Sequence, residues 1–555
     1  MTADRDTAAV PVPAPVDARD GDEAEASEAS EASEPWFDRV VRGSRLDDRW
    51  ARLLSTPRRR ALWYWGGPIA VTLLAAVLRF WDLGNPQSLI FDETYYVKDA
   101  WTLWHLGYEA RWPDDFDGSF ASGDVMGFLQ DPAYVVHPPL GKWLIGLGMA
   151  AFGAGDAFWW RATTALAGTI AVFLVSVVAR RLIGTTVIAV VAGLLLAVDG
   201  NAIVMSRVAL LDNWVMLFLL VGFWFVLLDR DPSRRRLDDR LDRLHAAGLE
   251  PHYGPVIWNR PWVVAAGVAF GAACAVKWSG VWFLAAFGLY LVAVDALARR
   301  RAGLPFWLTG ALLKQAPATF VLLVPVALVV YGASWAGWLL TDGGYYRTWA
   351  LDPAHQATGL FAWAPHWLQS LWFYHQSAYT FHVGLHATHP WASNPLTWLV
   401  MGRPTNMYYR ELDCGGSTCV ASVMGIGNPL IWWGGTIALG YLVYRFARYR
   451  QWQVGLILLG LAASYLPWLA YIGRTVFQFY SIAFEPYLVL GLAFVLAVIL
   501  GTRDDPSERR RQGIAIVAIY VGAVVAVSAF FYPIWAAIPI DPFFRQLHFW
   551  LPSWG

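Results

Sequence analysis

The chain has 555 residues, of which 57% are hydrophobic and 15% are charged, and its mean hydropathy is +0.40. This composition excludes an ordinary soluble globular protein and indicates a membrane protein. Basic and acidic residues balance, with 42 of each, so no bulk attraction to nucleic acid is expected.

The first 55 residues are predicted to form a disordered cytoplasmic tail. Ala, Glu, Asp, Ser and Pro dominate as far as Pro35, and a segment with so little apolar bulk cannot offset the entropy that it would lose on ordering. The tail has no apolar core followed by a cleavage site, so it does not have the pattern of a signal peptide.

Beyond the tail, about eleven apolar runs are predicted to span a membrane. Basic clusters begin at 58–60 and recur at 180–181, 234–243, 299–301, 445–450 and 509–511, and eleven spans place them all on the cytoplasmic side. The C-terminus is therefore expected outside. The runs lie near 62–81, 158–179, 184–199, 208–228, 261–276, 278–295, 311–333, 428–446, 452–471, 475–499 and 513–532.

This count requires that the apolar run 140–152 does not cross. It is too short for a straight span, so it is expected to lie on the outer leaflet, with 92–106 as a second surface helix. The chain then divides into a catalytic transmembrane module, 56–333, with a first extracytoplasmic loop at 82–157; a large extracytoplasmic loop, 334–427; and a second transmembrane module, 428–555.

The large loop is rich in histidine and aromatic residues, which predicts a compact, functional cap. Cys414 and Cys419 lie within it, outside the reducing cytoplasm, and are predicted to form a small disulfide.

Two motifs lie in the first extracytoplasmic loop. Phe-Asp-Glu-Thr-Tyr-Tyr at 91–96 places adjacent carboxylates just beyond the first span, and His-Pro-Pro-Leu-Gly-Lys follows at 137–142. Segments 206–213 and 277–280 come next, before the large loop. In this order the motifs resemble the protein O-mannosyltransferase family of polyprenyl-phosphate-dependent GT-C glycosyltransferases. The large loop has no trefoil-like domain, which resembles the bacterial branch.

The resemblance implies an all-α polytopic membrane protein of the GT-C type. It implies an inverting enzyme that transfers mannose from polyprenyl-phosphate mannose to Ser or Thr of exported proteins, as they leave the Sec translocon, at the outer face of the cytoplasmic membrane. No cofactor or metal is expected. One alternative is another GT-C transferase, which moves arabinose or aminoarabinose onto a glycan or lipid. A transporter or flippase is a second alternative and would predict internal repeats and mid-span charges.

Asp92 is the candidate general base for the acceptor hydroxyl. A partly desolvated carboxylate at the bilayer edge has a raised pKa, which suits that role. Glu93 is expected to position the acceptor or the loop. The alternative is that both residues supply favourable negative charge at a helix N-terminus.

Lys142, Arg161 and Arg403 are the candidates for binding the donor phosphate, since the outer face carries few cations. The alternative for Lys142 is a side chain that extends to the membrane surface, for Arg161 an interfacial anchor, and for Arg403 a salt bridge within the loop.

The expected substrate pocket combines residues from four segments. Asp212 and Arg207 are ionisable residues next to membrane segments; they line the pocket or, alternatively, pair with each other. The histidines have a spacing that also suggests a metal, but Gly384 and Pro390 argue against a regular helix, so contact with the substrate is favoured. The pocket candidates are His137, Arg207, Asp212, Lys277, His382 and His386.

Overall fold

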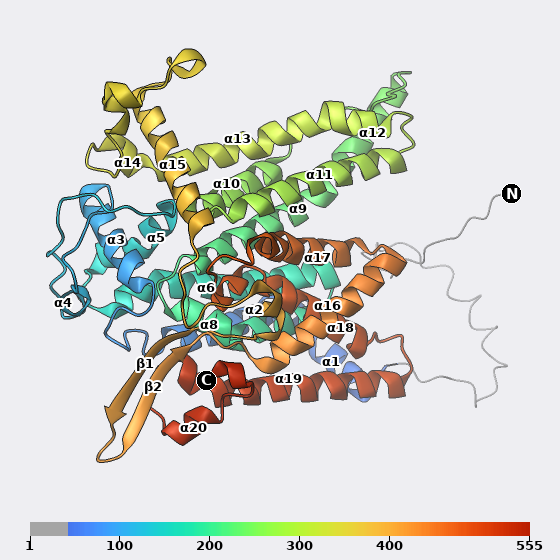
Figure 1. Ribbon diagram of the computed structural model, residues 1–555. Coiled ribbons are helices and arrows are strands. Elements are labelled where there is room, and N and C mark those ends of the chain that lie inside the picture. The colour runs from blue at the N-terminus through green and yellow to red at the C-terminus, as the bar shows by residue number, and fades with distance from the viewer. Residues whose placement is uncertain (1–42) are drawn as a thin grey trace, which may run out of the picture.

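The computed structural model describes residues 43–555 as a bundle of long helices with smaller elements gathered at one end (Figure 1). Its long helices are α2 (Pro57–Phe80), α6 (Ala157–Ile183), α7 (Thr186–Val198), α9 (Asp212–Ala246), α10 (Pro261–Val276), α11 (Gly280–Arg301), α13 (Ala316–Ser334), α16 (Pro429–Tyr449), α17 (Trp452–Tyr465), α18 (Glu485–Leu500) and α19 (Ser507–Trp535).

Within residues 43–555, seven helices are long and apolar enough to cross a membrane. An eighth crossing is formed if α7 and α8 (Gly200–Arg207), which meet at a bend of 59°, are one broken span. The chain is therefore a multi-span membrane protein. The count of eleven crossings stays a prediction. Of the three further helices that it needs, α10 and α18 are apolar but have only 16 residues each, about 24 Å of helix, and α16 is not among the helices that qualify.

Helices α2 and α6 run antiparallel, and this fixes the place of the segment that joins them. The Phe80 and Phe158 rings meet at one end of the pair, and Arg180 donates to the Tyr64 carbonyl at the other. Residues 81–156 therefore leave and re-enter the bundle at the same end, which we call the loop end. It holds α3 (Glu93–Leu106), α4 (Asp117–Ala121) and α5 (Leu140–Phe152).

Helix α5 packs on α3 and α6 at the loop end and does not traverse the bundle. Close packing depends on small residues: a Cβ atom added at Gly146 would lie 2.2 Å from the Trp104 ring. With 13 residues the helix is too short for a straight span, and its placement on the outer leaflet stays a prediction.

The opposite end of the bundle, which we call the basic end, carries the arginine clusters. Arg181 pairs there with Asp231, and Arg510 pairs with Asp47 at 2.9 Å. The second pair anchors α1 (Arg45–Leu53) to the start of α19.

Helix α1 lies within the segment that was expected to be disordered. Ser44 and Asp47 form a reciprocal capping box at its start, and the Arg510 guanidinium lowers the pKa of Asp47 to about 2, although burial opposes this shift. The boundary at residue 55 is therefore wrong for 45–53, because the composition that favours disorder ends at Pro35. The rest of the predicted tail, 1–42, lies outside the described residues.

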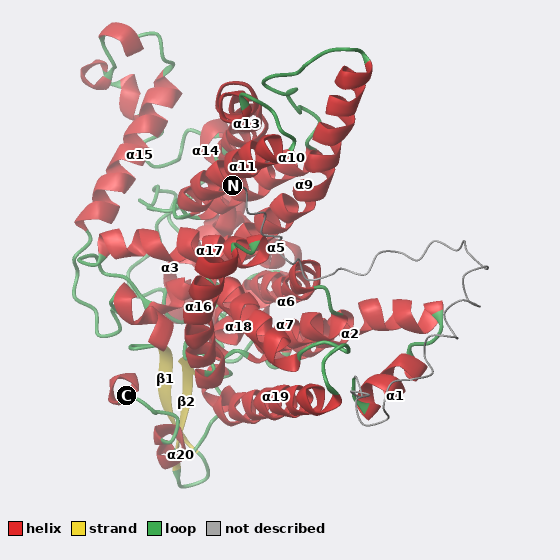
Figure 2. Ribbon diagram, turned by 90° about the vertical axis from the view of Figure 1, so that its right-hand side faces the viewer, coloured by secondary structure: helices red, strands yellow, loops and turns green. Residues whose placement is uncertain are grey.

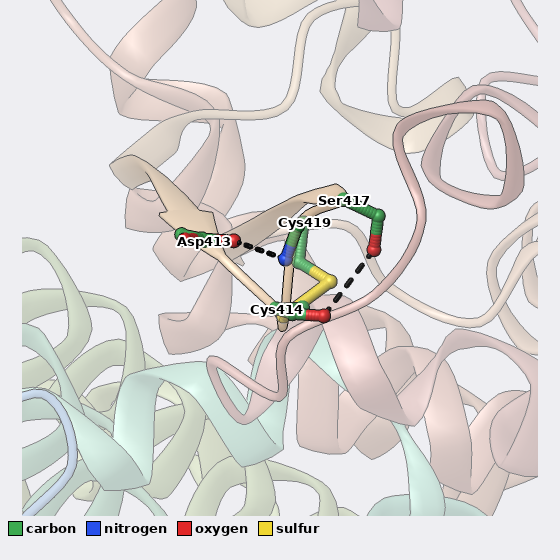
Figure 3. The surroundings of a disulfide bond; sticks show 5 residues. Asp413, Cys414, Ser417 and Cys419 are labelled. Atoms are coloured by element: carbon green, nitrogen blue, oxygen red, sulfur yellow. Dashed lines mark hydrogen bonds between the residues drawn. A yellow bond between two sulfur atoms is a disulfide. The ribbon is translucent and has the colours of Figure 1, made fainter.

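The described chain is helical as expected, apart from one β-hairpin in the large loop. Strands β1 (Asn406–Asp413) and β2 (Thr418–Met424) pair antiparallel. Gly415 and Gly416 have positive φ and allow the tight turn, and a disulfide joins Cys414 to Cys419 at the tip (Figure 3). Val420 and Ile540 exchange backbone hydrogen bonds, which hold the hairpin against the segment after α19.

The other helical elements of the large loop are α14 (Ala336–Leu340), α15 (His366–Gly384) and short 3-10 turns. Helix α15 is attached to the end of α13 through the Tyr331–His375 hydrogen bond and extends past the bundle (Figures 1 and 2). The segment before it projects beyond the bundle, so the loop is only in part the compact cap that the sequence suggested. The remaining short helices are α12 (Trp307–Thr309) and α20 (Pro542–Gln546).

Buried polar contacts join the two transmembrane modules. Asp199, at the bend between α7 and α8, accepts hydrogen bonds from the Asn428 backbone and the Trp432 indole. Asn201 donates to Glu485 at 2.8 Å. Because unpaired polar groups are costly in such surroundings, these contacts define one packing of the modules.

Candidate active site

A cavity of about 570 Å³ opens at the loop end, beside α10, α11, α13 and α15. One side is apolar and includes Val324 and Leu328 of α13 and Trp468 of the segment after α17. The other end is polar and cationic. Its lining residues are His137, Lys277, His375, His382, Arg474 and Tyr480.

Asp92 lies near this polar end, immediately before α3. Its carboxylate does not cap the helix, and no ion pair is found for it within residues 43–555. Burial raises its pKa to about 6, with Asp212 adding to the shift and Lys277 opposing it. Asp92 is therefore a free carboxylate with the pKa of a usable base.

The backbone before Asp92 is strained. Phe91 has a φ of +52°, which is rare for a bulky side chain. Its ring packs edge-on against Phe477 and Phe479, with centroids 5.5 and 5.6 Å away. The aromatic cluster thus holds the turn that directs Asp92.

Lys277 and Asp212 form an ion pair of 2.7 Å, and both side chains are nearly buried. Asp212 begins α9, and Lys277 ends α10. The Lys277 ammonium also lies 4.7 Å from the centre of the Tyr480 ring. The structure thus brings these two predicted pocket residues together near Asp92, and Asp212 pairs with Lys277 rather than with Arg207.

Two predicted histidines also meet at the cavity, where the His137 and His382 rings lie 5.0 Å apart. Arg474 donates to Nδ1 of His382, so the Nε2–H must donate to the Val136 carbonyl. Burial lowers the pKa of His382 to about 4 and that of His137 well below its usual value. Both rings are therefore neutral at pH 7.

Arg474 is a functional candidate that sequence analysis missed. It lines the cavity, its Nε is buried without a hydrogen-bond partner, and among the described residues no carboxylate pairs with it. It is the only Lys or Arg between Arg450 and Arg503. A lone cation in so apolar a stretch is a signal of function that could have found it.

Tyr480, Trp278 and His375 were also missed. Trp278 donates to the Tyr331 hydroxyl, and that hydroxyl hydrogen-bonds to His375 at 2.6 Å. Trp278 lies within the 277–280 motif, but no motif marks Tyr480 or His375, because tertiary contacts between separate segments bring these residues together.

Of the two roles expected of Glu93, positioning the loop fits the structure and contact with the acceptor does not. Its carboxylate is fully buried and accepts from the Ile90 and Ala209 backbone and from two nitrogens of Arg161. The residue fixes the loop to α6 and has no access to substrate.

Arg161 is likewise not a phosphate ligand. Besides its two bonds to Glu93, it donates to the carbonyls of Leu83, Pro86 and Ser88. All five N–H donors of the guanidinium are therefore used, and the residue is 1% exposed.

Lys142 is also buried, at 1% exposed, and it pairs with Glu109 at 2.5 Å. It donates to the carbonyl of His137 as well, at 3.3 Å. Lys142 therefore positions the turn that carries His137, and it does not line the cavity.

Arg207 neither lines the pocket nor pairs with Asp212. Its guanidinium donates to carbonyls at the end of α2, among them those of Arg79 and Trp81. A buried cation that caps a helix C-terminus is a structural element.

Two further candidates lie away from the cavity lining. His386 is exposed, and its ring bonds the Gly473 carbonyl. Arg403 donates to the Pro390 carbonyl and lies over the Trp391 ring. Within the described part of the chain, no three His, Cys, Asp or Glu residues are placed to hold a metal ion.

Comparison with known proteins identifies the family of the chain. A family described as "Dolichyl-phosphate-mannose-protein mannosyltransferase" matches residues 69–236, and the "C-terminal four TMM region of protein-O-mannosyltransferase" matches 367–554. A polyprenol-phosphate-mannose–protein mannosyltransferase of Mycolicibacterium smegmatis is 36% identical over 509 residues, 88% of this chain and 93% of that protein. The Mycobacterium tuberculosis protein of the same name is 36% identical over 87% of this chain and 90% of its own length.

The fold is also shared with a solved structure, the Saccharomyces cerevisiae protein O-mannosyltransferase Pmt1–Pmt2 complex bound to the sugar donor. The TM-score is 0.66 at 14% identity, over 93% of this chain and 95% of that chain. The GT-C fold expected from the sequence is confirmed. Because this identity extends over nearly the whole length of the chain, the chain belongs to the protein O-mannosyltransferase family.

Proposed function

We propose that this protein transfers mannose from polyprenyl-phosphate mannose to Ser or Thr hydroxyls of exported proteins. The observation that carries the proposal is the unpaired Asp92 beside a cavity with one cationic end and one apolar side. Such a site suits an acceptor hydroxyl, a phosphate and a lipid chain at once. The names of the relatives at 36% identity support the donor and the acceptor.

In the proposed reaction, the acceptor oxygen attacks the anomeric carbon on the face opposite the phosphate. Asp92 takes the hydroxyl proton as the new C–O bond forms. The bond between the anomeric carbon and the phosphate oxygen breaks, and its electron pair leaves with the polyprenyl phosphate. One displacement inverts the configuration and needs no covalent intermediate.

Arg474 and Lys277 replace Lys142 and Arg161 as the cations proposed to bind the leaving phosphate. Both line the cavity, and Arg474 has no carboxylate partner among the described residues. Cations already oriented toward the developing charge stabilise the transition state without rearrangement. Because these side chains supply the charge, we propose that the reaction needs no divalent metal.

We further propose that the loop end faces the outside of the cytoplasmic membrane and that the C-terminus lies there too. The arginine clusters at the basic end support this orientation, because Lys and Arg are enriched on the cytoplasmic side. Acceptor proteins would then reach Asp92 as they leave the Sec translocon.

The proposal is tested with purified protein in proteoliposomes that receive a Thr-rich peptide and one of three polyprenyl-phosphate sugars: mannose, arabinose or aminoarabinose. We expect mannose transfer to a peptide hydroxyl, unchanged by EDTA. Transfer only from an arabinose or aminoarabinose donor would show that this sugar, and not mannose, is the one transferred. A metal requirement restored by one ion would overturn the metal-free mechanism.

A further inference from the structure

The large loop contains an apolar projection that the proposed reaction does not explain. Between Pro353 and Gly402 the sequence has no Asp, Glu, Lys or Arg. Large apolar side chains in this stretch are strongly exposed, including Leu360 at 87%, Trp363 at 76% and Trp372 at 73%. We call residues 359–372 the crest. Exposed tryptophans without neighbouring charges are typical of side chains at a lipid–water interface.

An apolar stripe connects the crest with the cavity. Leu368, Trp372, Tyr379 and Val383 lie on one face of α15 at helical spacing, and all four are exposed. Ser370, Tyr374 and Ala378 lie on the other face and are buried.

The stripe faces the same side as the apolar surface of α13. Tyr379 and Val383 line the cavity together with Val324 and Leu328 of α13. Leu328 and its neighbour Val329 are 64% and 71% exposed, and they belong to a helix that qualifies as a membrane span. The crest is therefore continuous with a surface that lipid chains cover.

The direction of α15 places the crest at the depth of the membrane surface. The helix runs across the end of α13, and the crest projects sideways past the bundle in both views (Figures 1 and 2). The Tyr331 hydroxyl near the end of α13 bonds His375, and Trp335 packs on Tyr374, so the base of α15 is attached at that level.

We propose that the crest docks into the lipid leaflet at the loop end, with Leu360, Phe361 and Trp363 inserted between headgroups and acyl chains. The occupant of this apolar surface is the bilayer itself. Its lack of charge means that docking requires no anionic lipid. Docking holds the N-terminal end of α15, and the contacts of Tyr374 and His375 hold its middle, so the helix that carries His375 and His382 is supported by both lipid and protein.

The test places a bimane fluorophore on a cysteine introduced at Leu360 or at Trp363, in full-length protein that carries Cys274→Ala. The native disulfide leaves the introduced cysteine as the only free thiol. The protein is reconstituted into phosphatidylcholine vesicles. Asp342→Cys is the matched control, because Asp342 lies in the same loop with a side chain 89% exposed.

We expect brominated acyl chains to quench the label at 360 and 363, and iodide in the water to quench it several times less than at 342. Equal iodide quenching at all three positions would overturn the proposal. A label shielded from iodide but not quenched by brominated lipid would also overturn it, because a protein would then cover the crest. These readouts do not depend on the sugar that the enzyme transfers.

Discussion

At the scale of single residues, the adjacent carboxylates Asp92 and Glu93 have opposite environments. Glu93 accepts four hydrogen bonds and is sealed by Arg161, whereas Asp92 is left unpaired in the turn before α3. A catalytic base needs a carboxylate that is free to accept a proton, whereas a structural carboxylate has its charge compensated by hydrogen bonds and ion pairs. The pair therefore divides into a residue that positions the loop and the residue that we propose as the base.

The raised pKa of Asp92 predicts the pH dependence of transfer. Burial raises this pKa from 3.8 to about 6, and only the ionised form accepts a proton. We expect kcat/KM to be constant above pH 6 and to fall tenfold per pH unit below it. The stability of the fold has the opposite pH dependence, because the buried charge of ionised Asp92 costs folding free energy above pH 6. A pH–rate profile with the Thr-rich peptide checks this, and a rate that stays constant down to pH 4 would contradict it.

Arg474 is expected to carry much of the stabilisation of the leaving phosphate. Replacing it with alanine should cost about 2–4 kcal/mol of transition-state free energy, measured as kcat/KM for the lipid donor. Arg403→Ala is the matched control, since Arg403 is a cation of the large loop that does not line the cavity. If Arg403→Ala lowers kcat/KM as much as Arg474→Ala does, the phosphate does not bind at Arg474.

At the scale of elements, α5 and the turn before it depend on the buried Lys142–Glu109 pair. Removing either partner leaves an uncompensated charge, so Lys142→Met and Glu109→Gln should each lower stability by about 3–5 kcal/mol. The two variants should lose transfer to a similar extent, because both disturb the turn that carries His137.

Thermal unfolding and the KM for the donor test whether the pair is structural. Both quantities are measured on the two single variants and on the double variant Lys142→Met, Glu109→Leu. We expect the double variant to recover stability, since a buried apolar pair replaces a buried ion pair. Loss of donor use in Lys142→Met alone, with Glu109→Gln normal, would restore Lys142 as a phosphate ligand.

At the scale of the whole molecule, the eleven-span topology predicts that the C-terminus lies outside. A cysteine at Gly555, which is exposed, should react with an impermeant thiol reagent added to intact cells. A cysteine at Arg235, in the basic clusters, should react only after lysis. The opposite labelling pattern would show that the molecule has the opposite orientation in the membrane.

Much of the molecule follows from its sequence. Apolar length and charge position predict the helices, the two ends of the bundle and the surface placement of α5. The hairpin was missed, although Gly415 and Gly416 between two short strands are a hairpin signal. The order of motifs also led to the family and to Asp92.

Roles of individual cations did not follow from the sequence. Arg161, Arg207 and Lys142 stand next to membrane segments, as ligands of a phosphate would, yet each is satisfied by buried partners that come from distant segments. Whether a cation is free depends on tertiary contacts, which spacing does not reveal. Of the two cations that line the cavity in the described part of the chain, Lys277 pairs with Asp212, whereas Arg474 has no carboxylate partner and is not part of a recognised motif.

The central claim is that Asp92 is the base, and Asp92→Asn tests it most directly. In proteoliposomes with saturating peptide, we expect transfer to fall roughly 100- to 10,000-fold, because the amide has the shape of the carboxylate but cannot take the proton. Donor affinity and thermal stability at pH 7 should be retained or increased, and Asp342→Asn, at an exposed acid of the same end, should behave as the parent protein. Turnover of Asp92→Asn close to that of the parent would contradict the account.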